Sequence, residues 1–251
     1  MLRLIVLSLA IVCSGAVSAD DWGSIRGQIV VEGNIPEPEL LIAKDANVKD
    51  KTICAAQDHY ADDLIVDKDS KGLANVFVYL TKKPGSIHPD LLDPPMEAVS
   101  IKQVACQFTP HCVVLRTKQP LIVLNGDSIA HNTHVYPMKN QQISILIKPS
   151  SGPHEREQFE YRVPETLPVK VGCDFHPWMQ GYWLIVDHPY AALTDKDGKF
   201  HIDNLPLGDH EFKIWHERAG YLDTKYKVTV AAGDPVELTV LQISIDKLQR
   251  K

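Results

Sequence analysis

Short apolar segments separated by polar and turn-forming residues run along most of the chain, and long helical periodicity is absent. Several segments alternate apolar and polar positions, as in residues 226–230, which read YKVTV, and this alternation is typical of a half-buried strand. Only residues 43–51 and 89–92 favour a short helix. The pattern predicts an all-β fold of sandwich or barrel type, with strands at residues 24–31, 74–80, 112–115, 121–124, 142–148, 169–171, 182–186, 199–202, 211–215, 226–230 and 237–243.

Length, composition and charge narrow the classes of protein that this pattern allows. The 251 residues suit one large domain or two small ones. Hydrophobic residues make up 44% and charged residues 23%, which excludes a disordered, collagen-like or disulfide-dense chain. The formal net charge of −6 comes from 26 basic and 32 acidic residues without long runs of one sign, so no nucleic acid partner is expected.

The first nineteen residues have the form of a secretory signal peptide. Arg3 precedes an apolar run at residues 4–12, and residues 17–19 read VSA, an expected cleavage site before Asp20. A membrane anchor would need about 20 apolar residues, and no later segment qualifies, so the mature chain is expected to have no membrane span. Cys13 lies inside the apolar run and lacks the small residue that usually precedes a lipid-attachment cysteine. We expect export to the periplasm or the extracellular space.

The expected mature chain contains four cysteines: Cys54, Cys106, Cys112 and Cys173. Disulfides persist in exported proteins. If the segment between Cys106 and Cys112 is a strand, the two lie about 20 Å apart, too far for a disulfide. Either of them could pair with Cys54, and Cys106 is favoured because Cys112 begins an apolar run and fits a buried core position. Cys173 then has no obvious partner.

A candidate metal motif lies at Cys173, His176 and Met179. A thiolate, an imidazole and a thioether at this spacing can converge on one metal from a tight loop, and soft sulfur ligands together with imidazole select copper. A site of this kind needs a second histidine from elsewhere. His131 and His134 follow an apolar strand and are both candidates.

Residues 98–188 resemble the cupredoxins, or blue copper proteins. The features that match are Phe108 and Pro110, Asn125 and Asp127, the pair His131-Asn132, and the loop with Cys173, His176 and Met179. The short ligand spacing, with proline after the histidine, looks most like the amicyanins. In their histidine motif a proline stands where this chain has Ala130.

The resemblance implies one type 1 copper per chain in a Greek-key β-sandwich. His131, Cys173 and His176 would form its trigonal ligand set, with Met179 as the weak axial ligand. Asn132 would tie the two ligand loops together, and Pro177 and Trp178 would lie beside the ligands.

Each of these residues also has a structural interpretation. Cys173 could be a buried thiol and Met179 a core residue. His131 and His134 are three apart and so face opposite sides of a strand; the family position favours His131. Trp178 could shield the metal or simply pack in the core. The histidines without comparable spacing are expected to be structural: His111, His188, His210 and His216.

A second domain is expected around this one. Residues 191–212 resemble the second half of a carboxypeptidase regulatory-like domain, a small transthyretin-like β-sandwich, and residues 25–30 and 72–80 look like its opening strands. The predicted organisation is a signal peptide at 1–19, the first half of this sandwich at 20–85, the cupredoxin at 86–188 and the second half at 189–251. A disulfide between Cys54 and Cys106 would then connect the two domains. Asp197-Gly198 is expected to form a hairpin turn rather than a calcium loop.

The expected function is outer-sphere electron transfer by an exported type 1 copper protein, with redox partner proteins of unknown identity. Catalysis by this chain is not expected, because the histidines outside the candidate copper site form no paired His-x-His motif of a multinuclear copper centre. Two alternatives stay open: a copper-binding or copper-delivery protein without redox cycling, and a secreted β-sandwich that binds carbohydrate or protein.

Overall fold

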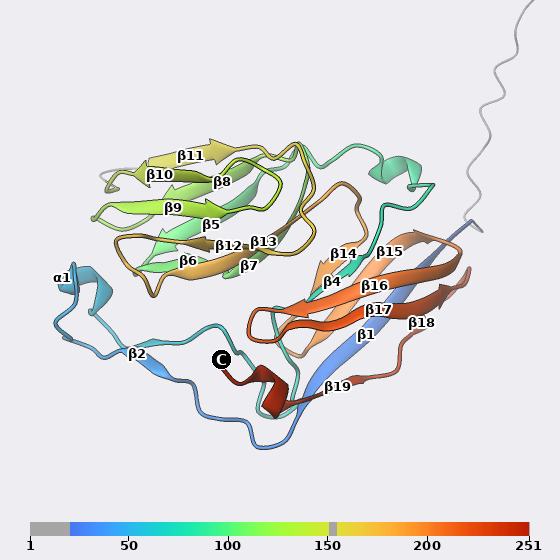
Figure 1. Ribbon diagram of the computed structural model, residues 1–251, viewed down its shortest axis with the longest axis horizontal. Coiled ribbons are helices and arrows are strands. Elements are labelled where there is room, and N and C mark those ends of the chain that lie inside the picture. Colours follow the sequence, from blue (N-terminus) through green and yellow to red (C-terminus); the bar gives the residue numbers. More distant parts are fainter. Residues whose placement is uncertain (1–20, 151–154, 251) are drawn as a thin grey trace, which may run out of the picture.

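The computed structural model describes residues 21–150 and 155–250, and the expected signal peptide and its cleavage site lie outside these residues. The predicted all-β class is confirmed (Figure 1). Within the described part of the chain, no helix is long and apolar enough to span a membrane. The elements are β1 Trp22–Glu32, β2 Leu40–Ile42, α1 Lys51–Cys54, β3 His59–Tyr60, β4 Phe77–Leu80, η2 Pro89–Leu91, β5 Val99–Val104, β6 Gln107–Thr109, β7 Cys112–Arg116, β8 Leu121–Asn125, β9 His131–Tyr136, β10 Ile143–Ile147, β11 Glu155–Phe159, β12 Val169–Gly172, β13 Gln180–Val186, β14 Ala191–Leu193, β15 Lys199–Pro206, β16 Gly208–His216, β17 Gly220–Val230, β18 Val236–Glu237, β19 Leu241–Ser244 and η3 Ile245–Leu248.

Strands β5 to β13 form the first sandwich, at the upper left of Figure 1. One sheet has the order β10-β9-β12-β13-β7 and the other β11-β8-β5-β6. The alternation in β8 explains its place: Leu121 and Val123 are fully buried, while Ile122 and Leu124 are half-buried. Burying one face of each strand in this way creates the core between the sheets, and Trp183 is among its largest buried side chains.

Two other sheets form the second sandwich, from segments at both ends of the chain. β1 pairs with β15, β18 and β19, and β4 pairs with β14 and β16. Strands that precede the first sandwich in sequence therefore share sheets with strands that follow it. This is the pairing that a split sandwich requires, although the exact domain limits stay a prediction.

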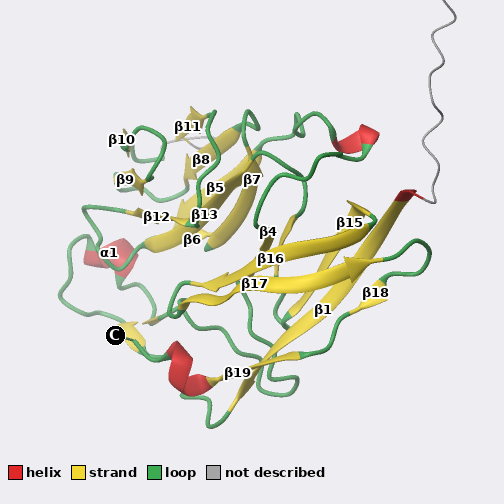
Figure 2. Cartoon of the chain, turned by 45° about the vertical axis from the view of Figure 1, so that its right-hand side comes forward, coloured by secondary structure: helices red, strands yellow, loops and turns green. Residues whose placement is uncertain are grey.

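The two sandwiches lie against each other, as Figure 2 shows. A separate apolar cluster with members on β4, β7, β13 and β16 fills the contact between them. Its buried members are Phe77, Tyr79, Cys112, Leu184, Val186 and Trp215. Burial of this apolar surface, at about 25 cal/mol per Å², stabilises the packing of the two sandwiches.

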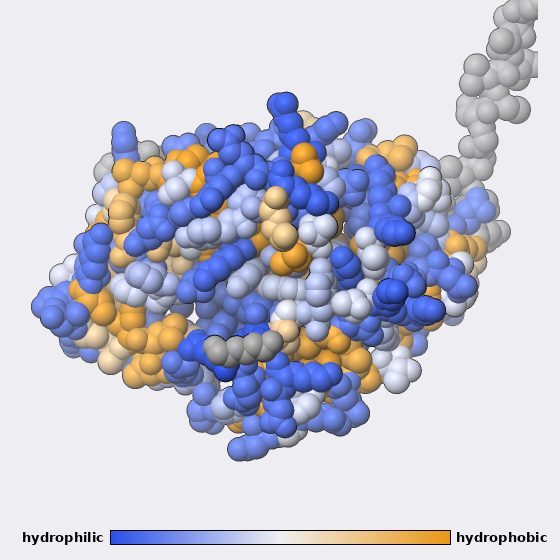
Figure 3. Space-filling model, in the orientation of Figure 1, coloured by the Kyte–Doolittle hydropathy of each residue, from blue (hydrophilic) through white to orange (hydrophobic). Residues whose placement is uncertain are grey.

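The outer surface contrasts with these cores. The face in Figure 3 is mainly hydrophilic, and its hydrophobic groups lie scattered among the polar ones. Such scattered apolar residues are normal for a protein surface.

Three local expectations need correction. The helix expected at residues 43–51 does not form, and the short helix α1 begins at Lys51. Asp45 and Asp50 have positive φ values of 62° and 53°, which are incompatible with an α-helix across this segment. The strand expected at residues 237–243 is divided into β18 and β19, which pair with successive parts of β1. The expected hairpin at Asp197-Gly198 is wrong, because β14 and β15 belong to different sheets and the turn crosses between them. A Cβ on Gly198 would lie 2.1 Å from the Ile29 carbonyl oxygen, so the close approach of the chains requires glycine.

His188 gives the fold a predictable dependence on pH. Burial lowers the pKa of His188 to about 4 from an ordinary 6.5, against the attraction of Asp187. Between about pH 6.5 and pH 4, His188 is therefore protonated in the unfolded chain but not in the folded chain. The free energy of unfolding decreases by about 3 kcal/mol as the pH falls through this range. Urea unfolding of wild type and His188→Gln across this range should show a smaller loss for the variant. Parallel stability curves would contradict this assignment.

Candidate metal centre

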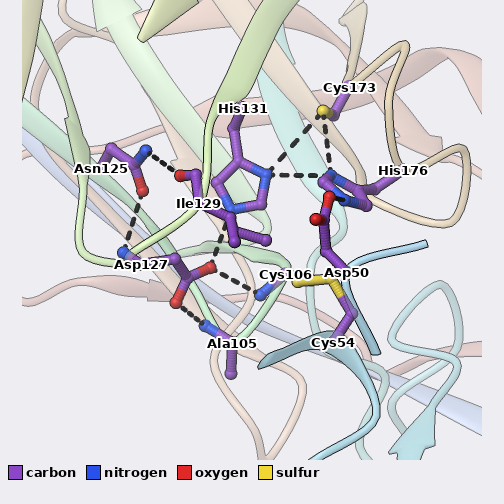
Figure 4. The surroundings of a disulfide bond; sticks show 10 residues. All are labelled: Asp50, Cys54, Ala105, Cys106, Asn125, Asp127, Ile129, His131, Cys173 and His176. Carbon is purple, nitrogen blue, oxygen red and sulfur yellow. Dashed lines mark hydrogen bonds and ion pairs between the residues drawn. A yellow bond between two sulfur atoms is a disulfide. The ribbon is translucent and has the colours of Figure 1, made fainter. Parts of the chain in front are cut away.

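Three side chains named by the sequence motif meet at one buried point (Figure 4). His131 begins β9, Cys173 follows β12, and His176 lies in the loop before β13. The Nδ1 atoms of the two histidines are 3.1 Å apart, and the Cys173 Sγ lies 4.0 Å from Nδ1 of His131 and 3.6 Å from Nδ1 of His176. Both histidines are fully buried and Cys173 is 3% exposed. The same ring nitrogen of each histidine thus faces the thiol.

A carboxylate fixes the orientation of His131 from behind. Asp127 Oδ2 lies 2.8 Å from Nε2 of His131. The carboxylate also accepts hydrogen bonds from the backbone N–H groups of Ala105 and Cys106, at 2.7 and 2.9 Å. Asn125 Oδ1 accepts the backbone N–H of Asp127 itself, at 2.9 Å. With Nε2 held in this way, Nδ1 is the nitrogen left for a metal.

His176 is held in the same way by a residue that the sequence did not indicate. Asp50 Oδ2 lies 3.0 Å from Nε2 of His176, although the two residues are 126 positions apart. Asp50 directly precedes α1, whose last residue is Cys54. Cys54 forms a disulfide with Cys106 of the first sandwich, the pairing that the sequence favours, and the described free cysteines are Cys112 and Cys173. The disulfide therefore keeps the Asp50 segment over His176.

Removing the Asp50 carboxylate should weaken metal binding without unfolding the protein. Asparagine tolerates a positive φ as aspartate does, but Asp50→Asn removes the negative charge beside Nε2 of His176. Losing such a contact to the far nitrogen of a metal-binding histidine weakens metal affinity about 10- to 100-fold. Competitive copper titration should detect this loss, with an unchanged urea midpoint. The matched control is Asp45→Asn, an exposed position with positive φ in the same segment. Equal affinities for both variants would contradict the role of Asp50.

The surroundings of Cys173 favour its thiolate form. Burial alone would raise the pKa of Cys173, but hydrogen bonds from His131 and His176 and from the backbone N–H groups of Asn132 and Phe175 lower it to about 6. The thiolate is the form of cysteine that binds metals.

Asn132 links the two segments that carry the ligands. Its Oδ1 accepts the backbone N–H of Asp174 at 2.7 Å, and its Nδ2 donates to Asp174 Oδ2 at 2.6 Å. His134 lies on the other face of β9, where its Nδ1 is 2.9 Å from Asp174 Oδ1. The structure thus places His131 inside and His134 near the surface.

The rest of the ligand loop closes around the site. The backbone N–H of Met179 donates to the His176 carbonyl at 2.9 Å, and the Met179 carbonyl accepts the N–H of Cys173 at 3.2 Å. Met179 is 1% exposed and, with Cys173 and Pro177, lines a cavity of about 440 Å³. The ring of Trp178 packs 5.3 Å from that of His176, and its buried Nε1 has no hydrogen-bond partner among the described residues.

The donor set fits copper. Two imidazole nitrogens and one thiolate face each other in a buried pocket, with a thioether in the same loop, and His2Cys sites with a weak axial methionine are typical of type 1 copper. Carboxylates on the far nitrogens of both histidines are the outer contacts that metal-binding histidines usually have.

Comparison with known proteins gives limited overlap. No protein-family model and no curated protein matches the chain. Among solved structures, the chain is similar to a copper-containing nitrite reductase from Thermus scotoductus (18% identity, TM-score 0.32, 43% of this chain and 30% of that chain). It is also similar to a purple cupredoxin from Nitrosopumilus maritimus (19% identity, TM-score 0.28, 35% of this chain and 98% of that chain). Amicyanin from Paracoccus versutus has 15% identity and a TM-score of 0.31, over 43% of this chain and 96% of that chain. The chain thus spans less than a third of the nitrite reductase.

Proposed function

We propose that the protein is an exported type 1 copper protein that transfers single electrons between redox partner proteins. One observation carries the proposal: Nδ1 of His131, Nδ1 of His176 and Sγ of Cys173 face each other within 4.0 Å at a buried point. Bound copper would supply the one-electron redox chemistry. His131, Cys173 and His176 would hold it, one copper per chain, and Met179 would be the weak axial ligand.

The surrounding residues suit electron transfer because they restrict movement of the ligands. Asp127 and Asp50 hold the far nitrogens of the two histidines, and Asn132 joins the two ligand segments. Ligands fixed in this way change little between the two oxidation states, so little reorganisation accompanies electron transfer. The burial of both histidines also limits access of water to the metal.

Electron exchange rather than catalysis is the role that this pocket supports. His131, Cys173, His176 and Met179 would together complete the ligand set of the copper, and both histidines are fully buried. We therefore propose a carrier rather than an enzyme. A signal-peptide-like first segment and the Cys54–Cys106 disulfide support export to an oxidising compartment.

We also propose the domain organisation expected from the sequence, a cupredoxin domain at residues 86–188 inserted into a regulatory-like sandwich made of 20–85 and 189–251. The pairing of β1 with β15 and of β4 with β16 supports it. The apolar cluster between the sandwiches would hold the two domains together.

Voltammetry of the copper-loaded protein with Met179→Leu tests the carrier function. A reversible one-electron wave in the wild type, and a shifted potential with copper retained in the variant, would support it. The matched control is Met138→Leu, at a side chain that is 70% exposed, and it should leave the potential unchanged. Loss of copper from Met179→Leu, without a reversible wave in the wild type, would favour copper delivery instead.

A further inference from the structure

A second cluster of metal-binding side chains lies where the two sandwiches meet, and it shares no residue with the candidate metal centre. A ring nitrogen of His111, the Sγ of Cys112 and a carboxylate oxygen of Glu217 all lie within 4.8 Å of one another. His111 is 8% exposed and Cys112 4%, and the Glu217 side chain is 8% exposed. Burying several metal-binding atoms together costs free energy unless they bind a partner, such as a metal ion or one another.

Three separate parts of the chain build this cluster. His111 directly precedes β7 and Cys112 begins it, in the first sandwich, and Glu217 lies in the turn between β16 and β17 of the second. Asp62 comes from the segment that joins β3 to β4. His111 Nε2 contacts the Glu217 carboxylate, and His111 Nδ1 is 3.2 Å from Asp62 Oδ2. One imidazole thus lies between two carboxylates.

The contacts within the protein leave one nitrogen of His111 without a hydrogen bond. His111 Nδ1 is buried, and its approach to Asp62 does not have the geometry of a hydrogen bond. Arg218, the neighbouring cation, already pairs with Asp63 at 2.7 Å. Burial alone would lower the pKa of His111, but Asp62 and Glu217 raise it to about 10, so a protonated imidazole lies between the two carboxylates in the metal-free protein. One net negative charge remains beside the Cys112 thiol, and a divalent cation that displaces the His111 proton can balance it.

A cavity gives access to the cluster. Its volume is about 680 Å³, and His111, Glu217 and Asp62 line it, together with residues of both sandwiches such as Tyr182 and Arg218. A cation could enter through this cavity, and a water molecule or small ligand could remain beside it.

We propose that His111, Cys112 and Glu217 bind a divalent cation of the zinc type at the junction of the two sandwiches. Imidazole, thiolate and carboxylate are the ligands that zinc takes, and three protein ligands leave one position for a molecule from the cavity. Asp62 acts as a positioning residue through its charge, since its carboxylate lies 3.2 Å from Nδ1 of His111. Binding releases the Cys112 proton and one ring proton of His111 to solvent, since the thiolate and the neutral imidazole are the ligands. The site does not depend on the copper centre.

Zinc and cobalt titrations of the expected mature chain, residues 20–251, which lacks Cys13, test this site. The background is Cys173→Ser, which removes the other described free thiol, so that a near-ultraviolet thiolate-to-cobalt band reports on Cys112. In this background the chain should bind one zinc, measured by equilibrium dialysis, and show the cobalt band. Adding Cys112→Ser should abolish the band, and adding His111→Gln or Glu217→Gln should abolish stoichiometric zinc binding. Asp62→Asn should weaken zinc about 10- to 100-fold.

The matched control is His201→Gln, which removes a surface histidine paired with Asp203 at 2.8 Å and should leave zinc binding unchanged. Circular dichroism shows whether each variant is folded, and the Cys112→Ser comparison remains decisive if His111→Gln fails to fold. No stoichiometric zinc in the Cys173→Ser chain, or a cobalt band that survives Cys112→Ser, would overturn the proposal. The cluster would then be an ion pair that only holds the sandwiches together.

Discussion

Replacing both Cys54 and Cys106 with serine is expected to lower the free energy of unfolding by about 4 kcal/mol, as loop-closure entropy predicts for a crosslink of this span. The two cysteines are 52 positions apart, and the bond ties α1 to the first sandwich. The same double variant should bind copper more weakly, because Asp50 then loses its fixed position at His176. Urea unfolding and competitive copper titration measure the two effects.

The single variant Cys54→Ser is the internal control for this prediction. It breaks the same crosslink, so it should show nearly the whole loss of stability, and the second substitution should add little. A double variant within about 1 kcal/mol of the wild type would show that the crosslink contributes little to stability. Unchanged copper affinity in a destabilised variant would show that the position of α1 does not contribute to metal binding.

Replacing His131 with glutamine should abolish the thiolate-to-copper colour, whereas His134→Gln should retain it. His131 is fully buried with its Nδ1 facing Cys173 and His176, while His134 contacts Asp174 near the surface. His131→Gln removes one of three strong ligands, and a trigonal site does not form with two. Visible absorption of both variants after copper addition measures the difference.

The matched pair removes the same chemical group three positions apart on one strand. The far-ultraviolet circular dichroism of both should match the wild type. A coloured His131→Gln protein together with a colourless His134→Gln protein would reverse the assignment and make His134 the ligand.

The ligand loop could be predicted from the sequence because its geometry is local. Cys173, His176 and Met179 lie within one short loop, so their spacing alone brings them together. Alternation indicates only that one of His131 and His134 faces inward, and the resemblance to the cupredoxins favours His131. The contact of Asp50 with His176 could not be predicted, because it depends on how a segment 126 positions away folds back across the sandwich. No local pattern marks such a contact. The approach of Glu217 to His111 depends in the same way on packing between the sandwiches.

Many apolar or alternating strands could be predicted, as β8 and β17 were, but β5, which reads VSIKQV and alternates, is not among the predicted strands, and neither are the polar ones. β9 reads HNTHVY and is not among the strands that the apolar pattern predicts, because its polar side chains are buried by hydrogen bonds and by the site itself. β14 was missed too, since three residues carry too little pattern. The turn after it has the local signal of a hairpin, and this signal does not reveal that the flanking strands join different sheets.

Copper(II) titration of the purified protein beside Cys173→Ser, followed by visible absorption and EPR, tests the central claim most directly. We expect an intense blue or green colour that saturates at one copper per chain, with the EPR signal of a thiolate-bound centre, and neither feature in the variant. Cys112→Ser serves as the control for removal of a different buried thiol and should keep the colour. A colourless wild type, or copper binding that is the same with and without Cys173, would contradict the account.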